Sequence, residues 1–395
     1  MPIALVVKDF LWWLIKENTI VNWAYLTIGK RVFRAIPASK VDASKPLTSK
    51  PDYKTATPKS WPAIKGFTSG TTNEPLTVYR SIKSILLEEY MLKTALKQFG
   101  VPLAPKYAIL RGDNIQHADG GDNFFQKQPF TGRLIMSSYH LGPKTVRQYL
   151  KRLEAYQPDV IMAYPSSIYL LAKLAQESNW KPNWPLKCVF TSSETFSPDK
   201  QALVRSVFGP VCDHYGQAER VAALQTCVTG HYHVREDYSL VEFIPDEHGV
   251  RIVGSNVYNT AMPMSRYDTG DYVEGLETES VCECGNPSPY VKQVLGRDDD
   301  YVILPDGRQI GRLDVAFKGI DGLLEAQIEQ SAPDRIIIRY IGNEGCDHPV
   351  LTNKLENSLK ERLGSSLSYE FTPVKDLPRT RRGKFKSVIR SFDIA

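Results

Sequence analysis

The stretch FTSGTTNEP, residues 67–75, is the densest run of small hydroxyl-bearing and glycine residues in the chain. It lacks the GxxxxGK[ST] spacing of a Walker nucleotide loop. A Ser/Thr/Gly-rich loop can still hold an anion, because its backbone N–H groups and hydroxyls are hydrogen-bond donors. The alternative is a simple linker. The residues of this candidate phosphate loop are Thr68, Ser69, Gly70, Thr71 and Thr72.

Four later segments add charged candidates, namely HYGQAER with Glu219, SRYDTGDYV with Asp271, GRDDDYV with Arg297 and PRTRRGKF with Lys384. Each is a weak signal alone. The alternative interpretation is that Glu219 is a charge at the start of a helix and that Asp271 is an ordinary turn residue. The basic segment around Lys384 also suits a solvated edge or a nucleic-acid contact. Their order and distances, taken with the candidate phosphate loop, favour one shared function.

Cysteines and histidines form a second candidate site. Cys227 and His233 are followed by Cys282 and Cys284, which a single residue separates. Two cysteines that close rarely form a disulfide with each other. Thiolates with one imidazole suit a tetrahedral, structural Zn²⁺ site. His231 is the competing nitrogen ligand, and four reduced side chains without a metal are the alternative.

The elements around these residues alternate between strand and helix. Short apolar runs predict buried strands over YAILRG, DVIMAYP and CVFTS. Helical spacing predicts helices over SIKSILLEEYMLKTALKQFG, with Gly100 as its C-cap, and over PSSIYLLAKLAQES and PDKQALVRSVFG. This alternation predicts an α/β class with a parallel sheet. The run SLVEFIPDEHGVRIVGS predicts a hairpin, and a compact α+β pattern follows Arg297.

The length of 395 residues exceeds one ordinary core. We therefore predict a large domain over 1–298, in which 1–60 form a helical cap and linker, and a small α+β domain over 299–395. The net charge is +5 and the basic residues are dispersed, so nucleic acid is not an expected partner.

The N-terminal region is aromatic, but charged residues leave no apolar run of the ~20 residues that span a bilayer. It also lacks the layout of a signal peptide, so the cytoplasm is the expected location. The segment is predicted to form one or two amphipathic helices that cap the main domain. The alternative is a peripheral contact with a membrane surface or a partner through Trp12, Trp13 and Trp23.

In the order of these motifs, the chain resembles the acyl-adenylate-forming superfamily, from about Trp61 to Phe385. It is most similar to the branch of phenylacetate–CoA ligases and related capsule-biosynthesis proteins. The resemblance implies a large multi-sheet adenylation domain, a small mobile C-terminal domain and an active site between them. It also implies ATP and Mg²⁺ as requirements, and CoA as the leading acyl acceptor.

The resemblance further implies a role for each matching residue. The candidate phosphate loop would contact the β- and γ-phosphates of ATP, and Glu219 would hold Mg²⁺. Asp271 would bind both ribose hydroxyls with help from Arg297, and Lys384 would reach the α-phosphate and the carboxylate. The residues that would line the edges of the adenine and acyl pockets are Ser192, Ser193, Glu194, Tyr215 and Gly216. Asp299 falls at the hinge position of the family.

His233 is the preferred zinc ligand, because HVRED resembles a segment of zinc-bearing relatives. The chain departs from the family pattern at Asn73, where glycine is usual. Asn tolerates a left-handed backbone better than other non-glycine residues, so the turn can survive. The acyl pocket is expected near Tyr164, Ser166 and Phe190, without a cation for a second carboxylate.

Two outcomes are open for the acyl-adenylate: thioester formation on CoA, or amide or ester formation on an amino acid or a sugar. Neither the acid nor the acceptor follows from the sequence. The oligomeric state is equally open, with a homodimer as one candidate. A degenerate fold that binds nucleotide without turnover is disfavoured by the presence of Glu219, Asp271 and Lys384.

Overall fold

The structure is a computed structural model. It describes residues 19–36, 40–68, 76–111, 124–138, 140–247, 249–297, 302–305, 309–310, 313–317, 320–364, 367–378 and 385–391.

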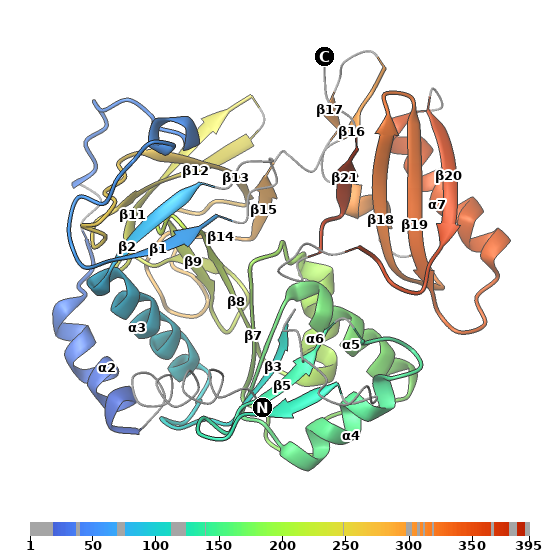
Figure 1. Ribbon diagram of the computed structural model, residues 1–395, viewed down its shortest axis with the longest axis horizontal. Helices are drawn as coiled ribbons and strands as arrows, with labels where there is room; N and C mark the ends of the chain where they lie inside the picture. Colours follow the sequence, from blue (N-terminus) through green and yellow to red (C-terminus); the bar gives the residue numbers. More distant parts are fainter. Residues whose placement is uncertain are drawn as a thin grey trace.

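A nine-stranded sheet forms the centre of the larger part of the molecule (Figure 1), in the order β14-β10-β9-β8-β7-β6-β3-β5-β4. Its five parallel strands are β3 (Tyr107–Arg111), β5 (Leu134–Ser137), β6 (Val160–Ala163), β7 (Cys188–Ser192) and β8 (Val211–Gly216). The antiparallel strands are β4 (Phe125–Lys127), β9 (Ala223–Thr226), β10 (Tyr232–Val234) and β14 (Tyr290–Val291). The parallel strands are largely apolar, as expected for a sheet covered on both faces, and polar residues such as Asp213 and His214 lie in β8.

Helices cover the two faces of this sheet. On one face, α4 (Val146–Tyr156), α5 (Pro165–Glu177) and α6 (Pro198–Phe208) enclose the largest hydrophobic core. On the other face lies α3 (Ile82–Gln98), which Ser81 caps at its start and which α2 (Thr19–Val32) flanks. Gly100 follows α3 with φ of +70°, which confirms the predicted end of this helix.

A second sheet has the order β11-β12-β13-β15. Its strands are β11 (Ser239–Asp246), β12 (Gly249–Asn256), β13 (Tyr267–Glu274) and β15 (Gln293–Arg297). The predicted hairpin over residues 239–255 is therefore confirmed. Beside this sheet lie the hairpin of β1 (Ala63–Phe67) and β2 (Thr77–Ser81) and the short helix η3 (Lys50–Tyr53).

The C-terminal part has a hydrophobic core of its own, whose members all lie between Val302 and Val388. A four-stranded sheet, in the order β20-β19-β18-β21, is formed by β18 (Leu323–Ala332), β19 (Arg335–Gly342), β20 (Ser368–Pro373) and β21 (Val388–Arg390). The other elements are β16 (Val302–Ile303), β17 (Gln309–Ile310), η4 (Leu313–Phe317) and α7 (His348–Leu363). The predicted domain boundary, at 298/299, lies outside the described residues.

The C-terminal part packs against α5 of the larger part (Figure 1). The contact runs between α5 and β18, where Leu324 joins the core of the large sheet and Ile341 packs against it. The mixed α/β architecture with several sheets and a C-terminal unit confirms the predicted fold class.

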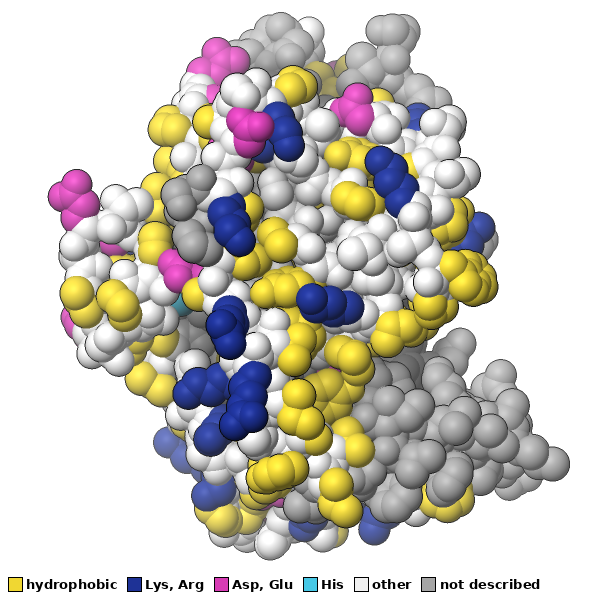
Figure 2. All heavy atoms as spheres, turned by 90° about the vertical axis from the view of Figure 1, so that its left-hand side faces the viewer, with side chains coloured by type: hydrophobic (Ala, Val, Ile, Leu, Met, Phe, Trp, Pro, Cys, Tyr) yellow, Lys and Arg dark blue, Asp and Glu magenta, His cyan; other side chains and the backbone are white. Residues whose placement is uncertain are grey.

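The face around α2 is apolar and basic. Figure 2 views the molecule from the left-hand side of Figure 1 and shows hydrophobic side chains next to Lys and Arg side chains. On α2, Ile20, Trp23 and Ile28 are exposed, and 56% of Trp23 is accessible. Trp12 and Trp13 lie outside the described residues. Among the helices that are described, none has the length and apolar character needed to cross a membrane.

Candidate active site and metal centre

The carboxyl ends of the parallel strands carry many of the predicted residues. Ligands bind at this edge in open α/β sheets. Here β7 ends at Ser192, and β8 ends with Tyr215 and Gly216. At Gly216 a Cβ would lie 2.7 Å from Nε2 of His214, so no larger residue fits there without a shift.

Glu194 joins three distant segments. Its Oε2 accepts a hydrogen bond of 2.9 Å from the backbone N–H of Ser166, at the start of α5. Its Oε1 accepts one of 2.9 Å from the backbone N–H of Phe385. The preceding residue, Ser193, has φ of +79°, which is unusual for a residue with a side chain and is typical of functional turns. Glu194 therefore connects the large part to the residue that follows Lys384.

Glu219 is buried, with only 4% of its surface accessible. Its Oε1 accepts a hydrogen bond of 3.2 Å from the hydroxyl of Tyr267, and its backbone carbonyl accepts one of 3.2 Å from Asn256. These contacts hold the carboxylate beside β13. The Oε2 oxygen is then the candidate ligand for a hard cation such as Mg²⁺.

Asp271 lies in β13 and is also buried. Its Oδ2 accepts a hydrogen bond of 2.7 Å from the hydroxyl of Tyr215, and its backbone N–H donates to Oγ1 of Thr269 at 3.1 Å. Asp271 is also paired directly with Arg297 across β13 and β15. The structure thus brings together Tyr215, Asp271 and the backbone of Arg297.

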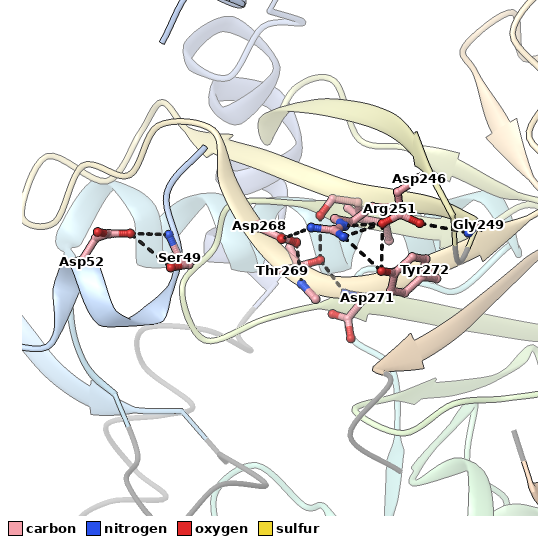
Figure 3. Close-up of polar contacts among 11 residues, drawn as sticks. Ser49, Asp52, Asp246, Gly249, Arg251, Asp268, Thr269, Asp271 and Tyr272 are labelled. Carbon is pink, nitrogen blue, oxygen red and sulfur yellow. Dashed lines mark hydrogen bonds and ion pairs between the residues drawn. The ribbon is translucent and has the colours of Figure 1, made fainter. Parts of the chain in front are cut away.

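A separate ionic cluster stiffens the same strand (Figure 3). Arg251 binds Asp246 and donates to Oδ2 of Asp268 at 2.6 Å, while Tyr272 donates to Asp246 at 3.0 Å. The carboxylate of Asp271 points away from this cluster. Alternation along a strand explains the separation, since neighbouring side chains point to opposite faces.

The candidate phosphate loop lies between β1 and β2 in the sequence. Thr68 closes its base, because its Oγ1 accepts a hydrogen bond of 2.9 Å from the N–H of Leu76 and its own N–H donates to the carbonyl of Leu76 at 3.0 Å. The hydroxyl of Thr68 thus has a role within the hairpin. The rest of the loop, Ser69, Gly70, Thr71 and Thr72, lies outside the described residues, as do Lys384 and Asp299.

The Cys/His residues meet in one place. One ligand atom from each of Cys227, His233, Cys282 and Cys284 lies within 4.8 Å of the others. The Sγ atoms of Cys227 and Cys282 are 4.0 Å apart. Thiolates bound at about 2.3 Å to one tetrahedral ion lie about 3.8 Å from each other, so the spacing fits Zn²⁺. The four residues come from the turn after β9, from β10 and from the loop before β14.

The surroundings of His233 suit a metal ligand. Its Nε2 lies 3.4 Å from Sγ of Cys284, while its Nδ1 lies 3.2 Å from the carbonyl oxygen of Ser288. Ligand histidines usually donate their second ring N–H in this way. His231 lies at the margin, with Nδ1 3.3 Å from Sγ of Cys282. Burial opposes the thiolate of Cys227, but hydrogen bonds from His233 and Thr229 outweigh it and lower the pKa of Cys227 to about 5.

Arg111 was not among the predicted site residues, although its position gave a signal: a cation directly at the end of an apolar strand. Its guanidinium donates a hydrogen bond of 3.2 Å to Oγ of Ser192 and lies 5.6 Å from the ring centre of Tyr164. A cation therefore lies beside Tyr164, one of the residues around which the acyl pocket was expected without a cation. Strand order brings Arg111 beside residues more than 50 positions later in the chain.

Comparisons with known proteins agree with this geometry. Residues 302–391 match the family model of the CapK C-terminal domain. Protein CapK of Staphylococcus aureus is 24% identical in an alignment of 350 residues that covers 86% of this chain and 77% of that protein. A phenylacetate-coenzyme A ligase of Thermus thermophilus is 25% identical in an alignment of 288 residues that covers 63% of this chain and 63% of that protein.

Solved structures of low sequence identity share the fold. The crystal structure of a 2-hydroxyisobutyryl-CoA ligase, in complex with an acyl-AMP, has a TM-score of 0.62 at 16% identity and covers 95% of this chain and 90% of its own. The anthranilate CoA ligase AuaEII has a TM-score of 0.51 at 14% identity, covering 82% of this chain and 65% of its own.

The fold is that of the adenylate-forming enzymes, and the resemblance to the acyl-adenylate-forming superfamily is confirmed. Within it, the chain is related to the phenylacetate–CoA ligase and CapK branch. These matches indicate an AMP-forming ligase.

Proposed function

We propose that this protein uses ATP to adenylate a small carboxylic acid and then transfers the acyl group to CoA. The observation that carries the proposal is the convergence of Glu194, Tyr215, Glu219 and Asp271 around the carboxyl edge of the large sheet and β13. Phe385, the neighbour of Lys384, binds Glu194 at the same edge. A nucleotide-dependent reaction explains why these polar groups are gathered and largely buried there.

The first step forms a mixed anhydride. A carboxylate oxygen of the acid attacks the α-phosphorus of ATP, the bond from that phosphorus to the bridging oxygen breaks, and pyrophosphate leaves with the bonding electrons. Negative charge builds on phosphate oxygens, so cations and N–H donors lower the barrier. Lys384 is proposed to supply the cation at the α-phosphate, and the loop at residues 68–72 the donors.

The other proposed ligands follow from the site. Asp271 would accept hydrogen bonds from the ribose hydroxyls, assisted by Arg297, and Ser193, Tyr215 and Gly216 would border the adenine. Glu219 would hold Mg²⁺, which neutralises phosphate charge. The buried carboxylate fits that ion, since hard cations prefer oxygen ligands.

The cluster of Cys227, His233, Cys282 and Cys284 is proposed to hold a structural Zn²⁺. Three thiolates and one imidazole leave no open position for a substrate. Its role would be to fix the loop before β14 against the turn after β9.

In the second step, the thiol sulfur of CoA would attack the acyl carbon and AMP would leave. The alternative acceptor is an amine or hydroxyl of an amino acid or a sugar, as in surface-polysaccharide biosynthesis. The alternative is supported by the match to Protein CapK, which spans more of this chain than the match to the CoA ligase. Use of ATP and CoA implies a cytoplasmic location.

Lys384→Ala separates the two steps. We expect pyrophosphate release to fall by about 10²–10³ or more, because one preorganised charge contact is lost. Consumption of a chemically supplied acyl-adenylate, with CoA, amino acids or amino sugars as acceptors, should change far less. An equal loss in both assays would contradict this role of Lys384. Absence of pyrophosphate release by the wild-type protein with every acid in a broad screen would contradict the function.

A further inference from the structure

The inner face of α2 is held closely against α3. Gly29 meets the ring of Tyr90, where an added Cβ would clash, so no larger residue fits there without a shift. Asn22 is buried and donates a hydrogen bond to the carbonyl of Leu103. Phe33, directly after the helix, is buried with its ring 5.5 Å from that of Tyr90. These contacts fix the rotation of α2 and therefore decide which of its side chains face outward.

The outward side of α2 carries large apolar side chains. Ile20 is 79% exposed, and Trp23 and Ile28 are each exposed over more than half of their surface. Trp23 follows Ile20 by three residues, so the two side chains are neighbours on the helix. Single exposed apolar residues are common, whereas a group of them marks an interaction site. Figure 2 looks onto this side of the molecule.

The same side of α2 is basic. Residues 19–32 contain no Asp or Glu, and the last turn carries Lys30 and Arg31. Lys30 follows Trp23 by seven residues, or two helical turns, so both lie on the outward side. Arg34 comes two residues after the helix and is exposed. Within the part of the chain that the structure describes, no carboxylate forms an ion pair with Lys30, Arg31 or Arg34.

The nearby charges of α3 do not cancel this positive charge. Glu89 lies close to Tyr25 of α2, and its charge adds to burial in raising the pKa of Tyr25 to about 12. Lys93 lies over the same ring, with its Nζ 5.4 Å from the ring centre. One anion and one cation therefore offset each other on that flank of α2.

An apolar helix side with adjoining cations fits a membrane surface that carries anionic lipids. Trp is favoured at the level of the lipid head groups, because its ring is apolar and its indole N–H is a donor. Lys and Arg are attracted to the negative head groups at the same depth. A second copy of this side of α2 fits less well, since it supplies no negative charge for Lys30 and Arg31.

We propose that α2 binds the surface of a membrane containing anionic lipids, through the α2 face formed by Ile20, Trp23, Ile28, Lys30, Arg31 and Arg34. The helix would lie in the plane of the membrane, with its apolar side chains among the head groups and its inner face still packed on α3. The inference is independent of the adenylation function, because it concerns where the protein is held and not what it catalyses.

The test is sedimentation of the full chain with two kinds of vesicle. One contains equal parts of phosphatidylcholine and phosphatidylglycerol, and the other contains phosphatidylcholine alone. We expect binding to the anionic vesicles, weakened by added salt because salt screens the charges. Lys30→Gln/Arg31→Gln should weaken that binding about 10–30-fold, since each cation at an anionic surface contributes about fivefold. Trp23→Ala should weaken it about tenfold, because apolar surface is no longer removed from water.

Two variants elsewhere in the chain are matched controls. Lys151→Gln/Arg152→Gln removes the same adjacent pair of charges from α4, which covers the other face of the large sheet. Val350→Ala removes an apolar side chain that is 50% exposed on α7. Both controls should bind the anionic vesicles as the wild type does. Circular dichroism checks that every variant is folded.

Failure of the wild type to bind anionic vesicles would overturn the proposal, as would an equal loss of binding in the α2 variants and the controls. Binding that needs Lys30 and Arg31 but not Trp23 would also overturn it, because any anionic polymer would then suffice as the partner. Light scattering tests for a second copy on this face. A dimer that Trp23→Ala converts to a monomer would show that the α2 face joins two chains instead.

Discussion

Asp271 is fixed by contacts on its own strand and by a tyrosine from another sheet. Thr269 accepts its backbone N–H, and the hydroxyl of Tyr215 donates to its carboxylate. Such a carboxylate is preorganised, because little side-chain freedom remains to be lost when a ligand binds. The same holds for Glu219 beneath the hydroxyl of Tyr267.

Asp271→Asn should weaken ATP binding. The amide keeps one acceptor oxygen but loses the charge and the second acceptor that the two ribose hydroxyls need. We expect KM for ATP to rise about 10–100-fold, corresponding to about 1.5–3 kcal/mol for hydrogen bonds to a charged group. Initial rates of pyrophosphate release over a range of ATP concentrations measure this.

Asp268→Asn is the matched control for that prediction. It makes the same change in the same strand, but on the face that binds Arg251. It should lower the melting temperature without a comparable rise in KM. Similar rises in KM for both variants would argue against a direct contact of Asp271 with the nucleotide.

The Cys/His cluster lies at one end of the large sheet, where β9, β10 and β14 form two antiparallel strand pairs. β10 pairs with β9 and β14, and the strands are short. Short strands supply few hydrogen bonds, so a bound metal would contribute much of the local stability. The loop before β14 leads to β15, which pairs with the strand of Asp271.

Zinc should copurify at about one ion per chain, and Cys282→Ser and Cys284→Ser should each reduce metal content and melting temperature. Loss of one thiolate weakens a closed tetrahedral site. Elemental analysis and thermal unfolding measure both effects. Cys346→Ser, in the C-terminal part, is the control and should keep the metal. Full occupancy in the Cys282→Ser/Cys284→Ser double variant would refute the site.

At the scale of the whole molecule, Glu194 is a link between the two parts. One oxygen caps the start of α5 through Ser166, and the other binds the N–H of Phe385, 191 residues away. Burial of Leu324 and Ile341 against the large core adds an apolar contact between the same parts. The carboxylate thus holds Phe385, the residue after Lys384, at the carboxyl edge of the large sheet.

Glu194→Gln should slow adenylation more than acyl transfer. A glutamine offers one acceptor oxygen, so the variant loses either the cap of α5 or the bond to Phe385. We expect pyrophosphate release to fall about 10–100-fold. Discharge of supplied acyl-adenylate, which does not need Lys384 at the α-phosphate, should fall much less. Glu177→Gln, at the exposed end of α5, is the control. A larger effect on discharge than on adenylation would contradict this role.

Local sequence patterns determined the elements and many of the candidate residues. Apolar runs and flanking turn residues predict β3, β6 and β7, and the spacing that ends at Gly100 predicts α3. These features depend on neighbours in the chain, which a sequence displays directly. The Cys/His spacing likewise indicates a metal site from the residue types and their order, whereas the nucleotide role of Asp271 is implied by the resemblance to a known family.

Only the tertiary structure decided which distant residues meet. The bond from Phe385 to Glu194, the contact of His233 with the carbonyl of Ser288 and the position of Arg111 over Tyr164 all depend on strand order and register. Order and register result from packing across the whole sheet and not from any local period, since a shift of one residue would turn each side chain to the other face. The cation beside Tyr164 could therefore be recognised only once β3 lay beside β6.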